Sequence, residues 1–296
     1  MKVRIGLGLG PMAESEDLTA LVDRLEEAGV DSLWFSEQVT APVVDPVVGL
    51  AHAASRTRRL KLGTGVSVLP GRHPVRVAKQ LASLAWLAPR RILPVFGLQP
   101  AREAERAFFP VPAGRRGAVL DESLTLVRLL LGEPRVTFRG EFFSVEDASV
   151  GFRLERPLDL WLGGSAPAGL RRVGRLADGW LGSFLTPEEA HDAIQVIRDA
   201  ATEAGRAVDE DHYGMSLPVA LTAPDERLLA TVAARRPGTD PRVLVPQGWD
   251  ELRRVVSEHV AAGVSKFVVR PAAPPESWER FVAGFCAELL PLQTQG

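Results

Sequence analysis

The stretch that decides the fold is Leu62-Gly-Thr-Gly-Val-Ser-Val-Leu-Pro-Gly-Arg-His-Pro-Val-Arg-Val-Ala-Lys-Gln-Leu-Ala-Ser-Leu84. Its beginning is short and apolar, which is typical of a buried strand, and from Pro74 its apolar residues have helical spacing. Proline and glycine between the two parts indicate a tight loop. A glycine inside a strand usually marks a bulge or a place where a ligand meets the backbone. The stretch therefore predicts a strand–loop–helix unit with a special feature at Gly63 or Gly65.

The same alternation of strand and helix covers most of the chain. Strands are predicted at 3–9, 32–35, 60–68, 91–96, 159–162, 179–182, 213–221 and 266–269. Helices are predicted at 17–28, 46–55, 74–87, 118–131, 168–176, 187–204, 249–262 and 277–290. Eight βα units without a break in composition favour one α/β domain over residues 1–296, a closed (β/α)8 TIM barrel, over an open doubly wound sheet. Residues 136–145 predict a small inserted hairpin, and residues 235–248 a long loop.

Composition excludes several classes of protein. With 24% charged residues, a net charge of −2 and no basic tract, the chain lacks the footprint of a nucleic-acid or membrane-surface binder. No apolar run approaches the ~18 residues that span a bilayer. We expect a cytoplasmic protein with a small-molecule substrate, and leave a homodimer open. The single cysteine, Cys286, lies in an apolar helical pattern and is expected in the core.

The segment Gly6-Leu-Gly-Leu-Gly10 suggests a dinucleotide site but fits it poorly. Its spacing is not Gly-x-Gly-x-x-Gly, and Glu37 lies about 30 residues on instead of the usual ~20. We expect instead that Gly8 ends the first barrel strand and leaves room for a flat ring.

The segment Gly163-Gly-Ser-Ala-Pro167 follows a predicted strand and opens a helix. Free backbone N–H groups and the helix dipole would make Gly163, Gly164 and Ser165 an anion site. An ordinary strand-to-helix turn is the alternative, and the nearby Arg171 and Arg172 favour phosphate.

Two further segments place polar residues at the expected mouth of the barrel. Trp34-Phe-Ser-Glu-Gln38 ends the second strand, where a polar residue faces the active site or caps the next helix. Arg102-Glu-Ala-Glu105 lies in the loop after the fourth strand. Each of its two glutamates either contacts a substrate or is a solvent-exposed charge on the surface.

Other chemistries are not supported. The five histidines have no second ligand at metal spacing, so no metal site is expected. No lysine follows a glycine, which excludes a P-loop, and residues 163–167 lack the final glycine of a nucleophile elbow.

Four motifs in chain order carry a family resemblance. They are Trp34-Phe-Ser-Glu-Gln38, Leu62-Gly-Thr-Gly-Val66 with Arg72-His-Pro-Val75, Arg116-Gly-Ala-Val-Leu-Asp-Glu122, and Gly163-Gly-Ser165 with Gly174-Arg-Leu-Ala-Asp-Gly-Trp180. From about residue 3 to residue 290 the chain resembles the bacterial-luciferase-like flavin and deazaflavin oxidoreductases. The last motif resembles the branch that uses coenzyme F420.

The resemblance implies a (β/α)8 barrel with a planar flavin-like ring at its mouth. By position, Gly65 and Val66 would back the ring across a cis peptide bond. Gly163, Gly164 and Ser165 would hold the phosphate of the cofactor, and Glu37 and Gln38 would lie beside the ring.

Three departures from the family pattern bear on the chemistry. Relatives that use F420 often have Asp-His where this chain has Glu37-Gln38, and glutamine has no titratable proton to give. Arg90 replaces the usual glycine before the fourth strand, and that strand ends in Gly97-Leu-Gln-Pro100. We therefore expect Glu37 or Glu105 to supply the proton, with water as the alternative.

These observations predict an oxidoreductase that transfers a hydride between coenzyme F420 and a small organic substrate. A monooxygenase that uses reduced FMN and oxygen, and a catalytically degenerate relative that only binds cofactor, are the alternatives.

Overall fold

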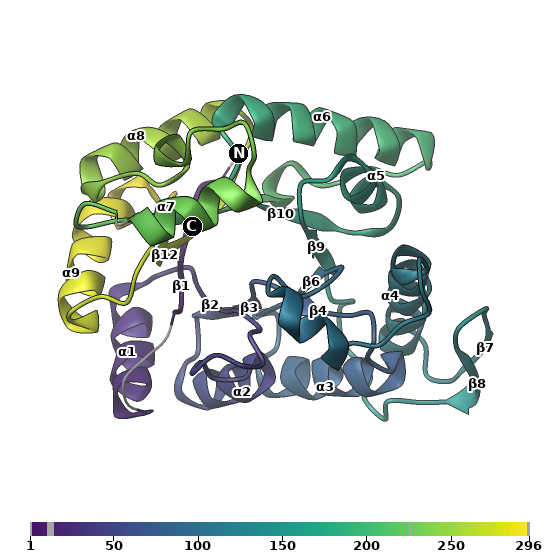
Figure 1. Ribbon diagram of the computed structural model, residues 1–296. Helices are drawn as coiled ribbons and strands as arrows, with labels where there is room; N and C mark the ends of the chain where they lie inside the picture. Colours follow the sequence, from purple (N-terminus) through teal and green to yellow (C-terminus); the bar gives the residue numbers. More distant parts are fainter. Residues whose placement is uncertain (1, 11–14, 225, 295–296) are drawn as a thin grey trace.

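The structure is a computed structural model that describes residues 2–10, 15–224 and 226–294. It has an α/β fold in which helices surround one curled parallel sheet (Figure 1). The strands of this sheet are β1 (Arg4–Gly8), β2 (Ser32–Phe35), β3 (Lys61–Thr64), β4 (Ser67–Val68), β5 (Ile92–Leu93), β6 (Val95–Gly97), β9 (Trp161–Gly163), β10 (Gly179–Ser183), β11 (Tyr213–Val219) and β12 (Lys266–Pro271).

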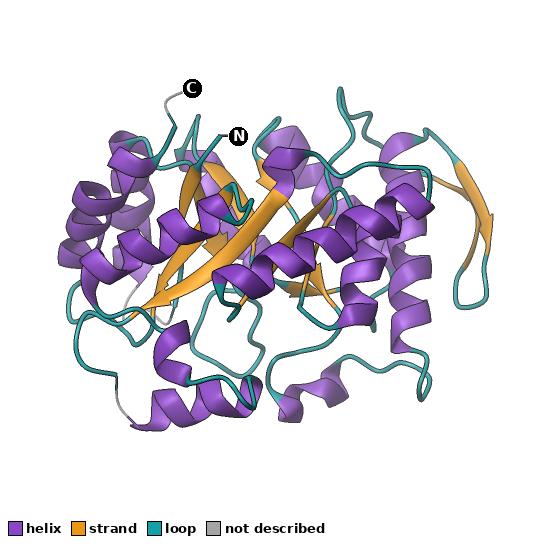
Figure 2. Ribbon diagram, turned by 90° about the horizontal axis from the view of Figure 1, so that it is seen from above, coloured by secondary structure: helices purple, strands orange, loops and turns teal. Residues whose placement is uncertain are grey.

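The helices lie outside the sheet, and short ones gather at one end of it (Figure 2). They are α1 (Ser15–Ala28), α2 (Pro46–Arg56), α3 (Pro74–Leu87), α4 (Arg116–Gly132), α5 (Pro167–Leu176), α6 (Pro187–Glu203), α7 (Glu226–Arg235), α8 (Gly248–Ala261) and α9 (Trp278–Leu289). The described residues also form the 3-10 turns η1 (Glu103–Phe108), η2 (Glu210–His212), η3 (Pro241–Leu244) and η4 (Leu290–Leu292).

The strand order explains how the sheet curls. It runs β4-β6-β9-β10-β11-β12-β1-β2-β3-β5, and every pair in it is parallel. The two strands at the ends of this order are β4, which follows β3 along the chain, and β5, which precedes β6. Because β3 pairs with β5 and β4 pairs with β6, residues 61–68 and 92–97 lie side by side and bring the two ends of the sheet together. The predicted strands at 60–68 and 91–96 are thus each split in two. The first is split at Gly65–Val66, whose peptide bond is cis, as the family resemblance implied.

Most predicted elements are confirmed, and three predictions need correction. The hairpin forms from β7 (Val136–Arg139) and β8 (Ser144–Ala148) and lies at the edge of the molecule (Figure 1). The predicted loop at 235–248 contains η3, and helix α7 before it was not predicted at all. That helix is ten residues long and has a single buried residue, Val232. Cys286 is only half-buried, because it lies at the margin of the core on α9.

Trp34 fills the interior of the sheet. Its side chain is fully buried and packs with Val95, Trp161, Leu181 and Val268. The indole N–H donates to the Ser32 hydroxyl at 2.9 Å. A Cβ at Gly6 would lie 2.7 Å from the indole nitrogen, and one at Gly63 would overlap the ring. Gly63 is therefore required by a neighbouring side chain and not by a ligand.

At the amino ends of the parallel strands, the carboxylate of Asp31 interacts with three basic side chains. Lys266 and Lys61 donate to its carboxylate at 2.8 and 2.9 Å, and Arg4 lies at 3.6 Å. Burial alone would raise the pKa of Asp31, but Lys266 and Lys61 outweigh it and lower the value from 3.8 to about 2. The cluster ties β1, β3 and β12 together where β2 begins.

We expect Gly63→Ala to lower the free energy of unfolding by about 1–3 kcal/mol, because the added methyl overlaps the Trp34 ring in a packed interior. Urea unfolding measures the change. Gly132→Ala is the matched control, since a Cβ there meets nothing within 4 Å at the end of α4. Equal stability of the two variants would contradict the packing described for Trp34.

We expect Asp31→Asn to remove a pH-dependent part of the stability. Because the folded pKa is depressed, the carboxylate stabilises the fold fully above pH ~4 and loses this effect as the pH falls towards 2. The shift corresponds to about 2 kcal/mol. The stability difference between wild type and Asp31→Asn should therefore narrow as the pH falls from about 5. Asp192→Asn, at an exposed position of α6, is the control, and a difference for Asp31→Asn that stays constant with pH would contradict the assignment.

Candidate functional site

A cavity of about 380 Å³ opens at the carboxyl ends of the parallel strands. Residues that follow β1, β2, β6, β9 and β10 line it, together with the bulge between β3 and β4 and residues 270–274 at the end of β12. In closed parallel sheets this face carries the functional residues. Gly65, Val66, Glu37, Gln38 and Gly164 of the predicted site all lie on this lining.

The Gly65–Val66 bulge is held from β2. The Gly65 N–H donates to the Phe35 carbonyl at 2.8 Å, and the Ser36 hydroxyl donates to the Gly65 carbonyl at 2.8 Å. The Glu37 N–H donates to the Val66 carbonyl at 3.2 Å. The bulge thus has a fixed position on one wall of the cavity.

Two glycines make room for the Val66 side chain. A Cβ at Gly97 or at Gly163 would lie 2.7 Å from a Val66 methyl group. Gly163 itself is half-buried next to the bulge, whereas Gly164 is the member of this turn that lines the cavity.

The carboxylate of Glu37 is occupied on both oxygens. One accepts a hydrogen bond from Arg72, and the other accepts from the Val68 N–H at 2.7 Å. Burial raises the pKa of Glu37 above its ordinary value, against the hydrogen bond from Val68 and the charge of Arg72. These contacts connect the end of β2 to β4 directly behind the bulge.

Glu105 is buried in η1, and its carboxylate faces the loop after β2. The Thr40 hydroxyl and N–H both donate to it, at 2.6 and 3.0 Å. Burial would raise the pKa of Glu105, but these bonds outweigh it and lower the value. Unlike Glu37 and Gln38, Glu105 is not part of the cavity lining.

The turn at Gly164 leads into the open end of α5. Gly164 has a φ of 109°, and its carbonyl accepts a hydrogen bond from the Trp180 indole at 2.7 Å. Ala166 precedes α5 without a capping side chain, and Pro167 begins the helix. Backbone N–H groups of the first turn are therefore available to an anion. Ser165 is half-buried beside them.

Two predicted contributors lie elsewhere. Arg172 turns away from the anion site and pairs with Asp121 on α4. Gly8 ends β1 as predicted, but a Cβ there would meet the Arg270 Cβ at 3.2 Å, and it is Leu9 and Gly10 that line the cavity.

Sequence reasoning missed Arg270 and Arg235, which both line the cavity. A signal for Arg270 was present, because a charged residue ends the apolar strand Phe267-Val-Val-Arg270 at the functional face. Arg235 had no such signal, since the helix that carries it was not predicted. Within the described residues, no group of three His, Cys, Asp or Glu side chains could hold a metal, and no helix could cross a membrane.

A family model for luciferase-like monooxygenases matches residues 2–282. This chain belongs to the luciferase-like monooxygenase family. It is 29% identical to an F420-dependent glucose-6-phosphate dehydrogenase of Kineococcus radiotolerans, over 97% of this chain and 97% of that relative. It is 31% identical to 4-hydroxyprotoasukamycin monooxygenase of Streptomyces nodosus subsp. asukaensis, over 75% of this chain and 64% of that relative.

The fold of this luciferase-like protein also agrees with solved structures. An F420-dependent secondary alcohol dehydrogenase, solved with an F420–acetone adduct, matches with a TM-score of 0.82 at 18% identity, over 99% of this chain and 100% of that one. The likeness supports the fold, and the family match confirms the resemblance drawn from the four motifs.

Proposed function

We propose that this luciferase-like protein is an oxidoreductase that transfers a hydride between coenzyme F420 and a small organic substrate. The observation that carries the proposal is that one cavity combines the Gly65–Val66 bulge with the open helix end after Gly164. The similarity to an F420-dependent dehydrogenase over nearly the whole chain supports F420 as the cofactor.

The residues present fit such a cofactor. A cavity of about 380 Å³ is within the usual range for ligand sites of about 300–1,000 Å³. Gly65 and Val66 would back the planar ring, while Gly163, Gly164, Ser165 and the first turn of α5 would bind the phosphate. A Cβ at Gly164 would meet nothing within 4 Å, so the space beside the turn is open. The deazaflavin ring supplies the hydride chemistry when bound, and the protein supplies its placement.

The cavity offers few groups that could exchange a proton. Among the described residues of the lining, Glu37 is the carboxylic acid, and both of its oxygens already accept hydrogen bonds. Gln38 is placed to orient a substrate by hydrogen bonding but has no titratable proton. We propose that Glu37 and Glu105 position the loops of the site and that the proton is exchanged with water.

A monooxygenase that uses FMN is the second candidate, supported by the similarity to 4-hydroxyprotoasukamycin monooxygenase.

We also propose that the chain forms a single (β/α)8 domain, and that the enzyme is cytoplasmic and acts alone or as a homodimer. Counted with each split strand as one, the sheet gives eight strands.

Spectral titration of the protein with F420 and with FMN tests the cofactor. We expect F420 to bind more tightly than FMN, and Gly164→Asp to weaken F420 binding at least tenfold, because a carboxylate would face the phosphate. Gly164→Ala is the matched control, since it introduces the same backbone strain at a φ of 109° without the charge. Tighter FMN binding, accompanied by oxygen uptake, would favour the monooxygenase. Equal F420 affinity of the two variants would place the phosphate elsewhere.

Glu37→Gln and Arg72→Gln together test the role of Glu37. Each breaks the same ion pair, so we expect both to lower the free energy of unfolding, by about 1–3 kcal/mol, and to lower F420-dependent turnover to a similar degree. Unfolding in urea and turnover measured at saturating F420 give the two readouts. A loss of turnover confined to Glu37→Gln would show that the carboxyl group itself transfers the proton.

A further inference from the structure

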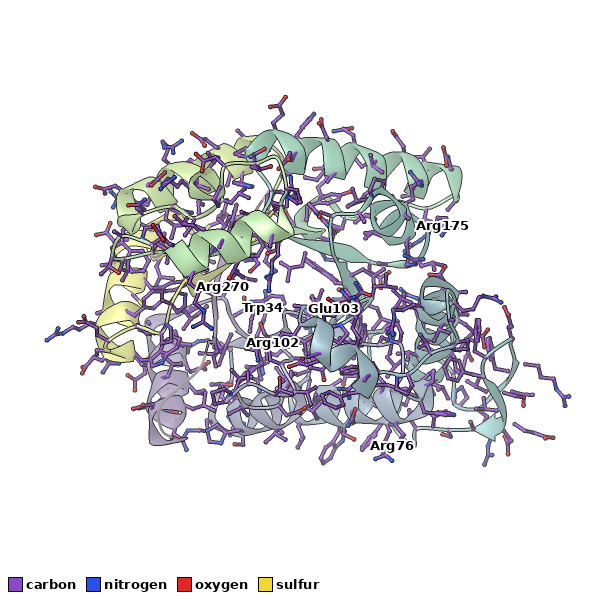
Figure 3. The ribbon with its side chains drawn as sticks, in the orientation of Figure 1. Trp34, Arg76, Arg102, Glu103, Arg175 and Arg270 are labelled. Carbon is purple, nitrogen blue, oxygen red and sulfur yellow. The ribbon has the colours of Figure 1, made fainter. Side chains whose placement is uncertain are left out.

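Three arginines from distant parts of the chain meet at the cavity. Arg102 precedes η1, Arg235 ends α7 and Arg270 belongs to β12, and all three line the same space. Figure 3 shows Arg102 and Arg270 near the centre of this view, whereas Arg76 lies at the periphery.

Phe184 connects two of these arginines. The guanidinium carbon of Arg270 lies 5.2 Å from the centre of the Phe184 ring, and that of Arg235 lies 5.5 Å from it. Phe184 directly follows β10 and has a positive φ of 55°. Both guanidinium groups thus lie within cation–π distance of one ring at the cavity.

In the part of the chain that the structure describes, none of the three arginines forms an ion pair with an acid, although the charge of Arg102 acts on the nearby carboxylate of Glu105. Each ion pair identified between described residues involves other arginines, lysines or histidines. The carboxylate on the cavity lining, Glu37, is already paired with Arg72.

The arginines also affect one another. Burial, followed by the charge of Arg235, lowers the pKa of Arg270 to about 10, so the group stays protonated at neutral pH. Burial and the charge of Arg102 lower the pKa of Arg235 in the same way. Like charges this close are held together at a cost that an anion would relieve.

We propose that the substrate carries an oxyanion, a carboxylate or a phosphate, that Arg270 binds in the cavity with Arg235 and Arg102 at its mouth. The inference rests on the proposed function and names the substrate class of that site. A planar guanidinium presents paired donors that match either oxyanion. The phosphate of the cofactor has its own place at the open end of α5, which leaves the arginines for the second ligand.

Isothermal titration of inorganic phosphate and, separately, of acetate tests the proposal without needing a known substrate. We expect at least one of them to bind the cofactor-free wild type, and Arg270→Gln to weaken that binding by about 10- to 100-fold. Which of the two binds more tightly identifies the oxyanion. Arg270→Lys, which keeps the charge, should restore part of the affinity, and Arg76→Gln, on the exposed face of α3, should leave it unchanged.

Spectral titration of the same variants with F420 separates substrate from cofactor. We expect Arg270→Gln to bind F420 as the wild type does. Arg235→Gln, at the end of α7, provides a second test if Arg270→Gln does not fold. Lack of binding of both anions to the wild type would overturn the proposal, and so would an equal loss of F420 affinity in Arg270→Gln. Anion binding that depends on Arg270 in a protein that binds no F420 would instead refute the proposed function and keep the anion site.

Discussion

The packing of Trp34 inside the curled sheet is the constraint on which the site depends. Its indole occupies space that side chains at Gly6 and Gly63 would need, and it is anchored to Ser32 on the same strand. The chain that leaves this strand continues directly into Ser36 and Glu37, whose backbone and side chains hold the Gly65–Val66 bulge. A buried ring therefore fixes the strand, and the strand fixes the wall of the cavity.

The glycines within the strands suggested that a ligand approaches the backbone there. The structure shows that neighbouring side chains occupy most of the space beside these glycines. Trp34 takes the place beside Gly63, and Val66 takes the places beside Gly97 and Gly163. Sequence alone does not separate these cases, because the side chain that fills the gap comes from another strand. The local patterns were more informative: Pro74–Leu87 and Ser32–Phe35 have the predicted bounds, since a capped amphipathic helix and a short apolar strand are specified locally.

The parts that could not be predicted depend on contacts between distant segments. The partner of Glu105 is Thr40, and the sequence places these residues 65 positions apart with no pattern that joins them. Helix α7 buries only Val232, yet it carries Arg235 to the cavity. The family motifs supplied the cis bond and the cavity residues Gly65, Val66 and Gly164, because those features are properties of short segments. The cluster of Arg102, Arg235 and Arg270 could not be predicted in this way, because it forms only when three distant segments meet at the cavity.

The two polar systems of the mouth have different electrostatic consequences. Glu37 and Arg72 neutralise each other behind the bulge, so they fix a wall without adding net charge to the cavity. Arg102, Arg235 and Arg270 form no ion pair with a described acid, and they add positive charge to the mouth of a cavity in a chain whose net charge is −2. A cleft lined by one sign of charge concentrates ligands of the opposite sign. The open end of α5 also favours an anion, so in our proposal backbone N–H groups bind the phosphate of the cofactor and guanidinium groups bind the oxyanion of the substrate. The two anions would then differ in the kind of donor that binds each.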